Sequence, residues 1–197
     1  MKFYKEWRQT VKKVLKDKSI RYAKVAYKGD RDNSENDWHK VRNPVRMLWS
    51  GLIFTIMRYL PPCRLKNGIY RMFGAKIGKN VAIAYNVFLD PLFPELITIE
   101  DGVMIGSDCE IATHEFVRDW FAMGRTVIKK KAMISAFNVI GAGVTVGENS
   151  ITGMFCFVKN DIPPNEFWVG VPAKKKMDLP KHGLMPEKDV EIIRYDN

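Results

Sequence analysis

The chain has 197 residues, with 32 lysines and arginines against 22 acidic residues, a formal net charge of +10. Its 46% hydrophobic and 27% charged residues are typical of a globular protein and exclude a disordered or collagen-like chain. The charge is uneven, because residues 1–79 hold 20 basic and 6 acidic side chains, whereas residues 80–197 hold 12 and 16. A cationic N-terminal part on a near-neutral body argues against a uniformly basic nucleic-acid-binding protein.

The sequence of residues 1–73 predicts a basic helical extension. A lysine-rich first segment has apolar residues on one helical face, the polar stretch at 29–37 predicts a loop, and the apolar stretch at 47–60 predicts a second helix. After two prolines, a third amphipathic helix follows. Its apolar side is expected to consist of Leu65, Ile69, Met72 and Phe73.

Two roles for this extension stay open. It could cap the open end of the domain that follows, or lie on an anionic membrane with its apolar face down and its basic residues at the headgroups. A membrane-spanning helix is disfavoured, because residues 47–60 would cover about 21 Å as a helix, which is short of the roughly 30 Å hydrocarbon core of a bilayer. The N-terminus also lacks the apolar core of a signal peptide.

Three cysteines without a CxxC pair do not form a disulfide framework or a zinc ribbon. Cys109 and Cys156 fall on a small-residue position of the repeat described next, which predicts core packing for both. A cytoplasmic protein is therefore expected, peripheral at the inner face of the membrane if the extension binds there.

A six-residue repeat begins at position 77. Aliphatic residues recur every six positions in three blocks, with a glycine often following, where we expect a tight bend. Very short strands joined by corners fit this period, and three hexads make one triangular coil, so twelve hexads predict about four coils of a parallel β-helix. The twelve positions are Ile77, Ile83, Leu89, Ile99, Ile105, Ile111, Ile128, Ile134, Ile140, Val146, Thr152 and Val158.

The stretch from Ile140 to Lys174, with NDIPP followed by VGVPA, resembles the hexapeptide-repeat acyltransferases that include maltose, galactoside and surface-glycan O-acetyltransferases. The resemblance covers roughly residues 70–177. It implies a mainly β protein with a left-handed parallel β-helix, a homotrimer with active sites between subunits, and acetyl-CoA as the acyl donor. The expected organisation is a helical extension at 1–73, the β-helix at 74–173 and a tail at 174–197 with a short helix near 188–195.

The repeat is interrupted twice, and insertions in such coils often map to a binding face. The segment after Leu89 is four residues longer than a hexad, and the segment after Ile111 is eleven longer and carries His114. Acyl transfer to a hydroxyl requires a base, and an imidazole titrates near neutral pH. The resemblance implies that His114 is this general base.

The resemblance also implies residues for the two substrates. Asp90, and more weakly Asn86, would bind the acceptor, with orientation of the histidine as a second role for the acidic group. A turn before Pro91 is the plain alternative for Asp90. On the donor side, Ala136 and Met154 would line the groove.

Charge-assisted contacts to phosphate explain lysines on the donor side. Lys159 would lie near the distal part of the cofactor, and Lys174 would meet a CoA phosphate. Met177 stands where the family has a second basic residue, so Lys175 or Lys176 could substitute.

The sequence therefore predicts a CoA-dependent O-acetyltransferase acting directly on a sugar or glycan-precursor hydroxyl, without a metal. Alternatives are an N-acetyltransferase on an amino sugar or other small amine, a covalent acyl-cysteine route and a non-catalytic scaffold. A hexapeptide-repeat carbonic anhydrase is excluded, since its zinc needs three converging histidines and His39 and His182 lie outside the coils.

Overall fold

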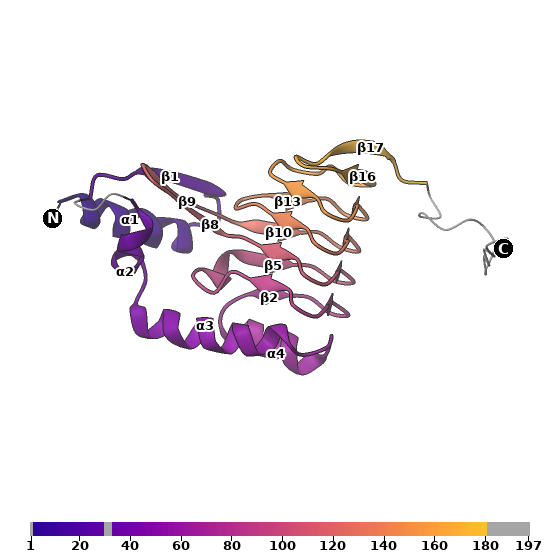
Figure 1. Cartoon of the computed structure of the whole chain (residues 1–197), viewed down its shortest axis with the longest axis horizontal. Helices are drawn as coiled ribbons and strands as arrows, with labels where there is room; N and C mark the ends of the chain where they lie inside the picture. The colour runs from indigo at the N-terminus through magenta and orange to yellow at the C-terminus, as the bar shows by residue number, and fades with distance from the viewer. Residues whose placement is uncertain (1, 30–32, 181–197) are drawn as a thin grey trace, which may run out of the picture.

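The computed structural model describes residues 2–29 and 33–180, and its body is a column of three parallel β-sheets (Figure 1). Each sheet receives one short strand from every coil of the chain. The first sheet stacks β2 (Lys76–Ile77), β5 (Ile97–Ile99), β10 (Thr126–Ile128) and β13 (Thr145–Val146). The second stacks β3 (Ala82–Ile83), β6 (Met104–Ile105), β11 (Met133–Ile134), β14 (Ile151–Thr152) and β16 (Glu166–Val169), followed by antiparallel β17 (Lys174–Asp178). The third stacks β4 (Phe88–Leu89), β7 (Glu110–Ile111), β12 (Val139–Ile140) and β15 (Phe157–Val158).

The inward side chains of the column are those of the six-residue repeat. All twelve repeat positions are buried, none more than 7% exposed, and the aliphatic ones form one continuous core. The prediction of a mainly β protein with parallel sheets is confirmed. Main-chain hydrogen bonds join neighbouring coils in both directions, as in Ala82 N to Val103 O (2.9 Å) and Gly102 N to Lys79 O (2.9 Å).

The glycines that follow the repeat positions have a different role from the one expected. The left-handed conformations belong mainly to residues other than glycine, such as Asn86 (φ 56°) and Asp108 (φ 59°), and to none of the glycines that follow the repeat positions. Gly106 and Gly147 lie instead against the neighbouring coil, where a Cβ would come within 2.6 Å of Ala136 N and 2.4 Å of Pro164 N. These glycines therefore allow coils to stack closely.

Helices α3 (Pro44–Arg58) and α4 (Arg64–Met72) lie across the first-coil end of the column (Figure 1). Asn43 caps α3 by accepting from the N–H groups of Val45 and Arg46, and Pro44 is tolerated in the first turn. The inner side of the two helices adds Phe54, Met57 and Tyr70 to the core of the column. These helices therefore cover coil side chains that solvent would otherwise reach.

Because no coil precedes the first one, the carbonyls on its outer side take their hydrogen bonds from α4. Arg71 donates to the carbonyls of Ile77 and Gly78 (both 2.7 Å). Asn67 donates to Val81 O (2.8 Å). Lys66 donates from Nζ to Leu60 O (3.0 Å), Ile83 O (3.1 Å) and Ala84 O (2.7 Å). Polar donors thus occupy the inner side of α4.

The predicted apolar side of α4 is accordingly wrong in part. Leu65 and Met72 are 65% and 84% exposed, while Lys66 is fully buried and Asn67 nearly so. Burial lowers the pKa of Lys66 to about 8, so its ammonium stays charged at neutral pH and uses all three N–H groups. The hydrogen-bonding requirement of the coil end outweighs hydrophobic patterning on this helix.

A second core joins the N-terminal elements to the larger insertion. The N-terminal elements are α1 (Lys2–Lys16), β1 (Tyr22–Ala26), η1 (Glu35–Asp37) and α2 (Trp38–Val41). The insertion forms a hairpin of β8 (His114–Val117) and β9 (Trp120–Gly124), and β1 adds to it antiparallel. Trp7, Phe121 and Met123 are buried in this core, which also includes Phe93 of the smaller insertion ahead of η2 (Pro94–Leu96). Strand β1 was not expected, because its partner lies about a hundred residues away in sequence.

The tail begins as a strand, since β17 starts at Lys174. The predicted helix near 188–195 and His182 lie outside the described residues. No helix in the described part of the chain combines the length and apolar character needed to cross a membrane.

Replacing Lys66 by methionine removes the three donors and leaves the carbonyls of Leu60, Ile83 and Ala84 without this partner. We expect Lys66→Met to lower the free energy of unfolding by about 2–4 kcal/mol, measured by urea denaturation. The exposed Arg64→Met is the matched control and should change stability by less than about 0.5 kcal/mol. Equal stability of the two variants would contradict the capping role.

Candidate active site

His114 begins the hairpin as the chain leaves the third sheet. Asp90 leaves the same sheet one coil earlier, after β4. Because β4 and β7 pair in parallel, with Leu89 opposite Ile111, the residues that follow the two strands lie side by side at one corner. The N–H of Asp90 donates to Ile111 O (3.2 Å), which fixes its main chain against the later coil.

Asp90 and His114 form a hydrogen-bonded pair. Asp90 Oδ2 lies 2.5 Å from His114 Nδ1, and the aspartate is only 2% exposed. Its carboxylate also accepts from Thr113 Oγ1 (2.5 Å), Thr113 N (3.0 Å) and Leu92 N (2.8 Å). Both carboxylate oxygens are therefore bonded within the protein, and the group faces the histidine rather than open solvent.

The protonation state of Asp90 reflects two opposed effects. Burial alone would raise the pKa of Asp90, but the charge of His114 and the hydrogen bonds from His114, Thr113 and Leu92 lower it overall. A buried carboxylate with this number of donors stays ionised at neutral pH. It can therefore hold a proton on Nδ1 of the imidazole.

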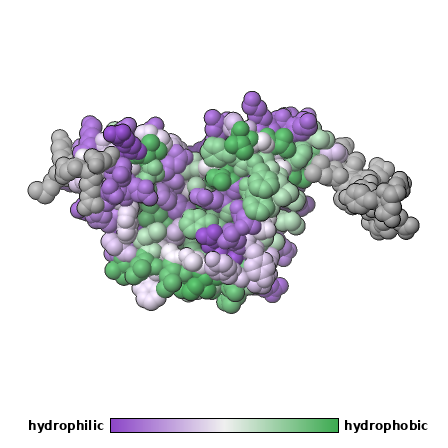
Figure 2. Space-filling view, in the orientation of Figure 1, coloured by the Kyte–Doolittle hydropathy of each residue, from purple (hydrophilic) through white to green (hydrophobic). Residues whose placement is uncertain are grey.

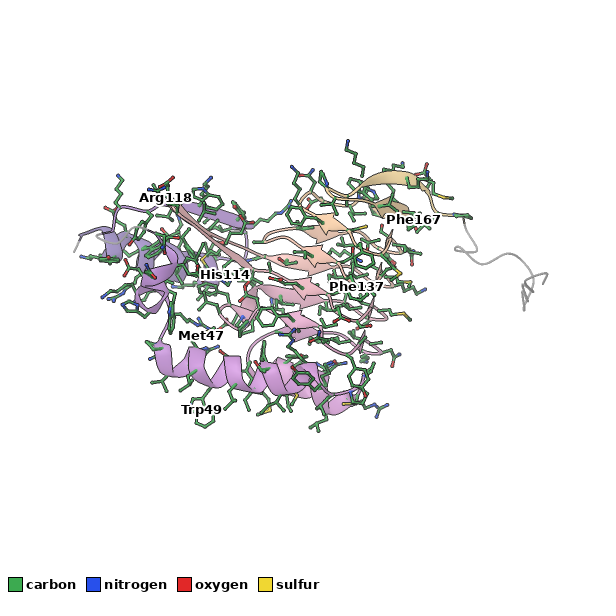
Figure 3. The ribbon with its side chains drawn as sticks, in the orientation of Figure 1. Met47, Trp49, His114, Arg118, Phe137 and Phe167 are labelled. Atoms are coloured by element: carbon green, nitrogen blue, oxygen red, sulfur yellow. The ribbon has the colours of Figure 1, made fainter. Side chains whose placement is uncertain are left out.

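The imidazole ring of His114 is packed among aromatic side chains. Phe93, Phe116 and Phe121 have ring centroids 6.0, 5.1 and 6.5 Å from it. The histidine side chain remains 25% exposed, and no hydrogen bond joins Nε2 to any described residue. In Figure 3, His114 lies where the N-terminal elements meet the column. With Nδ1–H donated to Asp90, the lone pair of Nε2 can accept a proton from a bound substrate.

Asn86 lies at a different corner, between β3 and β4. Its Oδ1 accepts from Arg58 Nε (3.1 Å) and Nη2 (2.8 Å), and its Nδ2 donates to Asp108 Oδ1 (2.5 Å). These bonds tie the corner to α3. Within one chain, the structure does not bring Asn86 together with His114.

Ala136 and Met154 lie at the same corner as Asn86, on later coils. Main-chain bonds connect the successive levels of this corner, and Phe155 N donates to Ala136 O (3.2 Å). Met154 is 58% exposed, and the adjacent rings of Phe137 and Phe155 stack with centroids 4.7 Å apart. The two predicted groove residues are therefore neighbours, but His114 occupies another corner.

The two predicted lysines lie apart as well. Lys159 follows β15 at the corner used by His114, two coils further on, and Lys174 begins β17. Both are exposed, and neither forms an ion pair with another described residue. Lys175 forms ion pairs with Glu166 (2.9 Å) and Asp178 (2.7 Å). Of the two lysines that could replace the family's second basic residue, Lys176 is therefore the better candidate for a phosphate contact.

Sequence reasoning missed Thr113 and the aromatic residues around the histidine. Thr113 directly precedes His114 in the sequence, so its hydroxyl could have been named as a hydrogen-bonding group of the site. Phe93, in contrast, comes from a separate insertion, and the sequence does not show that it approaches the histidine. Within residues 2–29 and 33–180, no group of three or more potential His, Cys, Asp or Glu ligands could hold a metal ion.

The chain is similar to proteins named as acetyltransferases. No protein-family model matches the chain. A putative acetyltransferase of Staphylococcus aureus is 37% identical to this chain over 127 residues. The match covers 64% of this chain and 79% of the relative. Putative acetyltransferase YvoF of Bacillus subtilis is 29% identical over 140 residues, covering 70% and 81%.

Solved structures share the fold. A galactoside acetyltransferase in complex with coenzyme A has a TM-score of 0.59 at 19% identity, covering 76% of this chain and 90% of that one. A hexapeptide-repeat acetyltransferase from Vibrio cholerae has a TM-score of 0.57 at 20% identity, covering 70% and 92%. The chain belongs to the hexapeptide-repeat acetyltransferase family.

The Asp90→Asn variant tests the pair. An amide presents an N–H₂ or a weaker acceptor to Nδ1 and no longer fixes the proton there. We expect acetyl transfer to fall by about 10²-fold or more in steady-state assays, with substrate KM values changed little. Asp101→Asn is the control, since Asp101 lies at another corner and bonds to Lys79 N. Activity of Asp90→Asn close to that of this control would contradict the assignment.

Proposed function

We propose that the protein transfers an acetyl group from acetyl-CoA to a hydroxyl of a sugar or glycan precursor, with His114 as the general base. The observation that carries the proposal is the pairing of His114 Nδ1 with the buried Asp90 carboxylate at 2.5 Å. This pairing leaves Nε2 for the acceptor. Asp90 is proposed to position the histidine rather than to touch the acceptor, since its oxygens are already bonded within the protein.

Transfer would be direct, in a ternary complex. The acceptor oxygen attacks the thioester carbonyl carbon while its proton moves to Nε2 of His114. The C–S bond then breaks, and the CoA thiolate takes the proton from the imidazolium. Backbone N–H groups lining the groove would hold the developing oxyanion. No step requires a metal.

The cysteines support a direct route over an acyl-cysteine intermediate. Burial raises the pKa of Cys109 to about 11, and burial also raises the pKa of Cys156. Both are at most 2% exposed in the core of the column. A nucleophilic cysteine needs an accessible thiolate. Neither side chain meets this requirement.

Acetyl-CoA is proposed as the donor. Related structures carry the donor or its product, including the galactoside acetyltransferase with coenzyme A and the Vibrio cholerae enzyme with acetyl coenzyme A. In this chain, Ala136 and Met154 would contact the pantetheine arm. Lys159 and Lys174 would meet the distal part and a phosphate.

The corner positions support a homotrimer with active sites between subunits. Ala136 and Met154 lie at one corner of the triangular coil and His114 at another, so one groove can combine them only when two copies meet. The outward residues of the second and third sheets include Met104, Met133, Val139 and Phe157, each 37–51% exposed. Such apolar faces suit contact between subunits. The left hand of the coil stays part of this proposal, because strand pairing alone does not fix it.

The His114→Ala variant should lose acetyl transfer while keeping its fold. We expect thiol release from acetyl-CoA, measured against a panel of sugars and amines, to fall by about 10³-fold or more with the best acceptor. His39→Ala is the matched control, because His39 lies on α2, outside the coils. Wild-type turnover in His114→Ala would overturn the mechanism. Faster turnover with amines than with hydroxyls would overturn the acceptor class alone.

The Lys174→Ala variant tests the donor side. Loss of a phosphate contact should raise KM for acetyl-CoA several-fold and leave kcat nearly unchanged. Lys28→Ala, which removes an exposed positive charge from the N-terminal elements, should leave both constants unaltered. An unchanged KM in Lys174→Ala would remove this residue from the donor site.

A further inference from the structure

Helix α3 presents a row of large apolar side chains to solvent. Its members recur at helical spacing, so they lie along one face over nearly the whole helix. They are Val45, Leu48, Trp49, Leu52, Ile56 and Tyr59, between 49% and 69% exposed. We define these six residues as the outer row.

The outer row faces away from the body. The opposite face of α3 is buried on the column through Phe54 and Met57, and in Figure 3 Trp49 points outward from the molecule. Figure 2 shows green, hydrophobic surface along the lower edge of the molecule, where α3 lies in Figure 1. On α4, Leu65 and Met72 are also exposed, because its inner side carries the polar groups that cap the first coil. Exposed apolar side chains therefore occur on both helices.

Positive charge borders this surface. No Asp or Glu occurs between residues 38 and 89. A hollow of about 470 Å³ beside α4 is lined in part by Arg64, Arg71 and Lys79. Arg71 donates there to the main-chain carbonyls of Ile77 and Gly78, which are uncharged and do not neutralise its guanidinium. Two acidic groups lie nearby: Glu95 is shared by Arg42 and Arg46 and cannot neutralise both, and Asp101 accepts from the main-chain N–H of Lys79 (2.7 Å).

We propose that this face binds an anionic lipid bilayer, with the outer row in the interface and the hollow beside α4 facing lipid phosphates. A straight apolar row with basic residues at its borders is the arrangement of a helix that lies in the membrane surface. A second copy of the chain fits less well. Two such faces brought together would place Arg64, Arg71 and Lys79 of each copy near those of the other.

The test is flotation of the full chain with vesicles, without acetyl-CoA, so its outcome is independent of the proposed reaction. We expect binding to vesicles of phosphatidylcholine with phosphatidylglycerol at least tenfold stronger than to phosphatidylcholine alone. The preference should weaken in 0.5 M salt. No binding to the anionic vesicles would overturn the proposal.

Variants identify the surface. Trp49→Ser with Leu52→Ser should weaken binding at least tenfold, and Arg64→Ser with Lys79→Ser should remove most of the preference for anionic vesicles. Val117→Ser is the control, because Val117 is an exposed apolar residue on the hairpin. Near-ultraviolet circular dichroism checks that each variant is folded.

Two results would assign the surface differently. Unchanged vesicle binding by folded Trp49→Ser/Leu52→Ser would move the contact to another face. A smaller assembly for this variant than for the wild type in lipid-free sedimentation would instead show that the outer row contacts a second copy. Either result would overturn the membrane proposal.

Discussion

The main-chain hydrogen bonding of each coil to its neighbours is the constraint on which the rest of the structure depends. Each strand has only two or three paired residues, so the register of every coil is set by its neighbours. Because no coil precedes the first one, its outward-facing carbonyls, such as those of Ile77, Val81 and Ile83, need donors from outside the column. Lys66, Asn67 and Arg71 of α4 supply them. Much of the positive charge near residue 70 thus has a structural purpose, and the apolar side chains of α4 turn outward as a consequence.

The same register builds the candidate active site. The coil that ends at Leu89 lies against the coil that ends at Ile111, so two insertions leave the column at one corner and place Asp90 beside His114. The carboxylate is buried, and four hydrogen bonds from protein groups make its charge tolerable there. The second core then surrounds the imidazole with phenylalanine rings. Positioning of the base therefore depends on both the column and the N-terminal elements.

Much of the column could be predicted, because a period of six with inward aliphatic residues has one simple structural solution, and all twelve predicted positions are buried. His114 was identifiable as the one histidine in the repeat body. Its partner Asp90 was expected first to bind the acceptor and only second to orient the histidine. The sequence shows that Asp90 begins an insertion but not which way its carboxylate points. Strand β1 and the buried Lys66 were missed because both depend on partners distant in sequence. Local patterning carries no information on the carbonyls that Lys66 meets.

The central claim is that Asp90 holds a proton on Nδ1 of His114 and leaves Nε2 as the base. It is tested most directly by ¹⁵N nuclear magnetic resonance of the histidine side chains at pH 8, where a histidine ring is ordinarily neutral. The His114 signals are assigned by their loss in His114→Gln. The account predicts a protonated Nδ1 and an unprotonated Nε2 in the wild type. A proton on Nε2, with Nδ1 unprotonated, would contradict it.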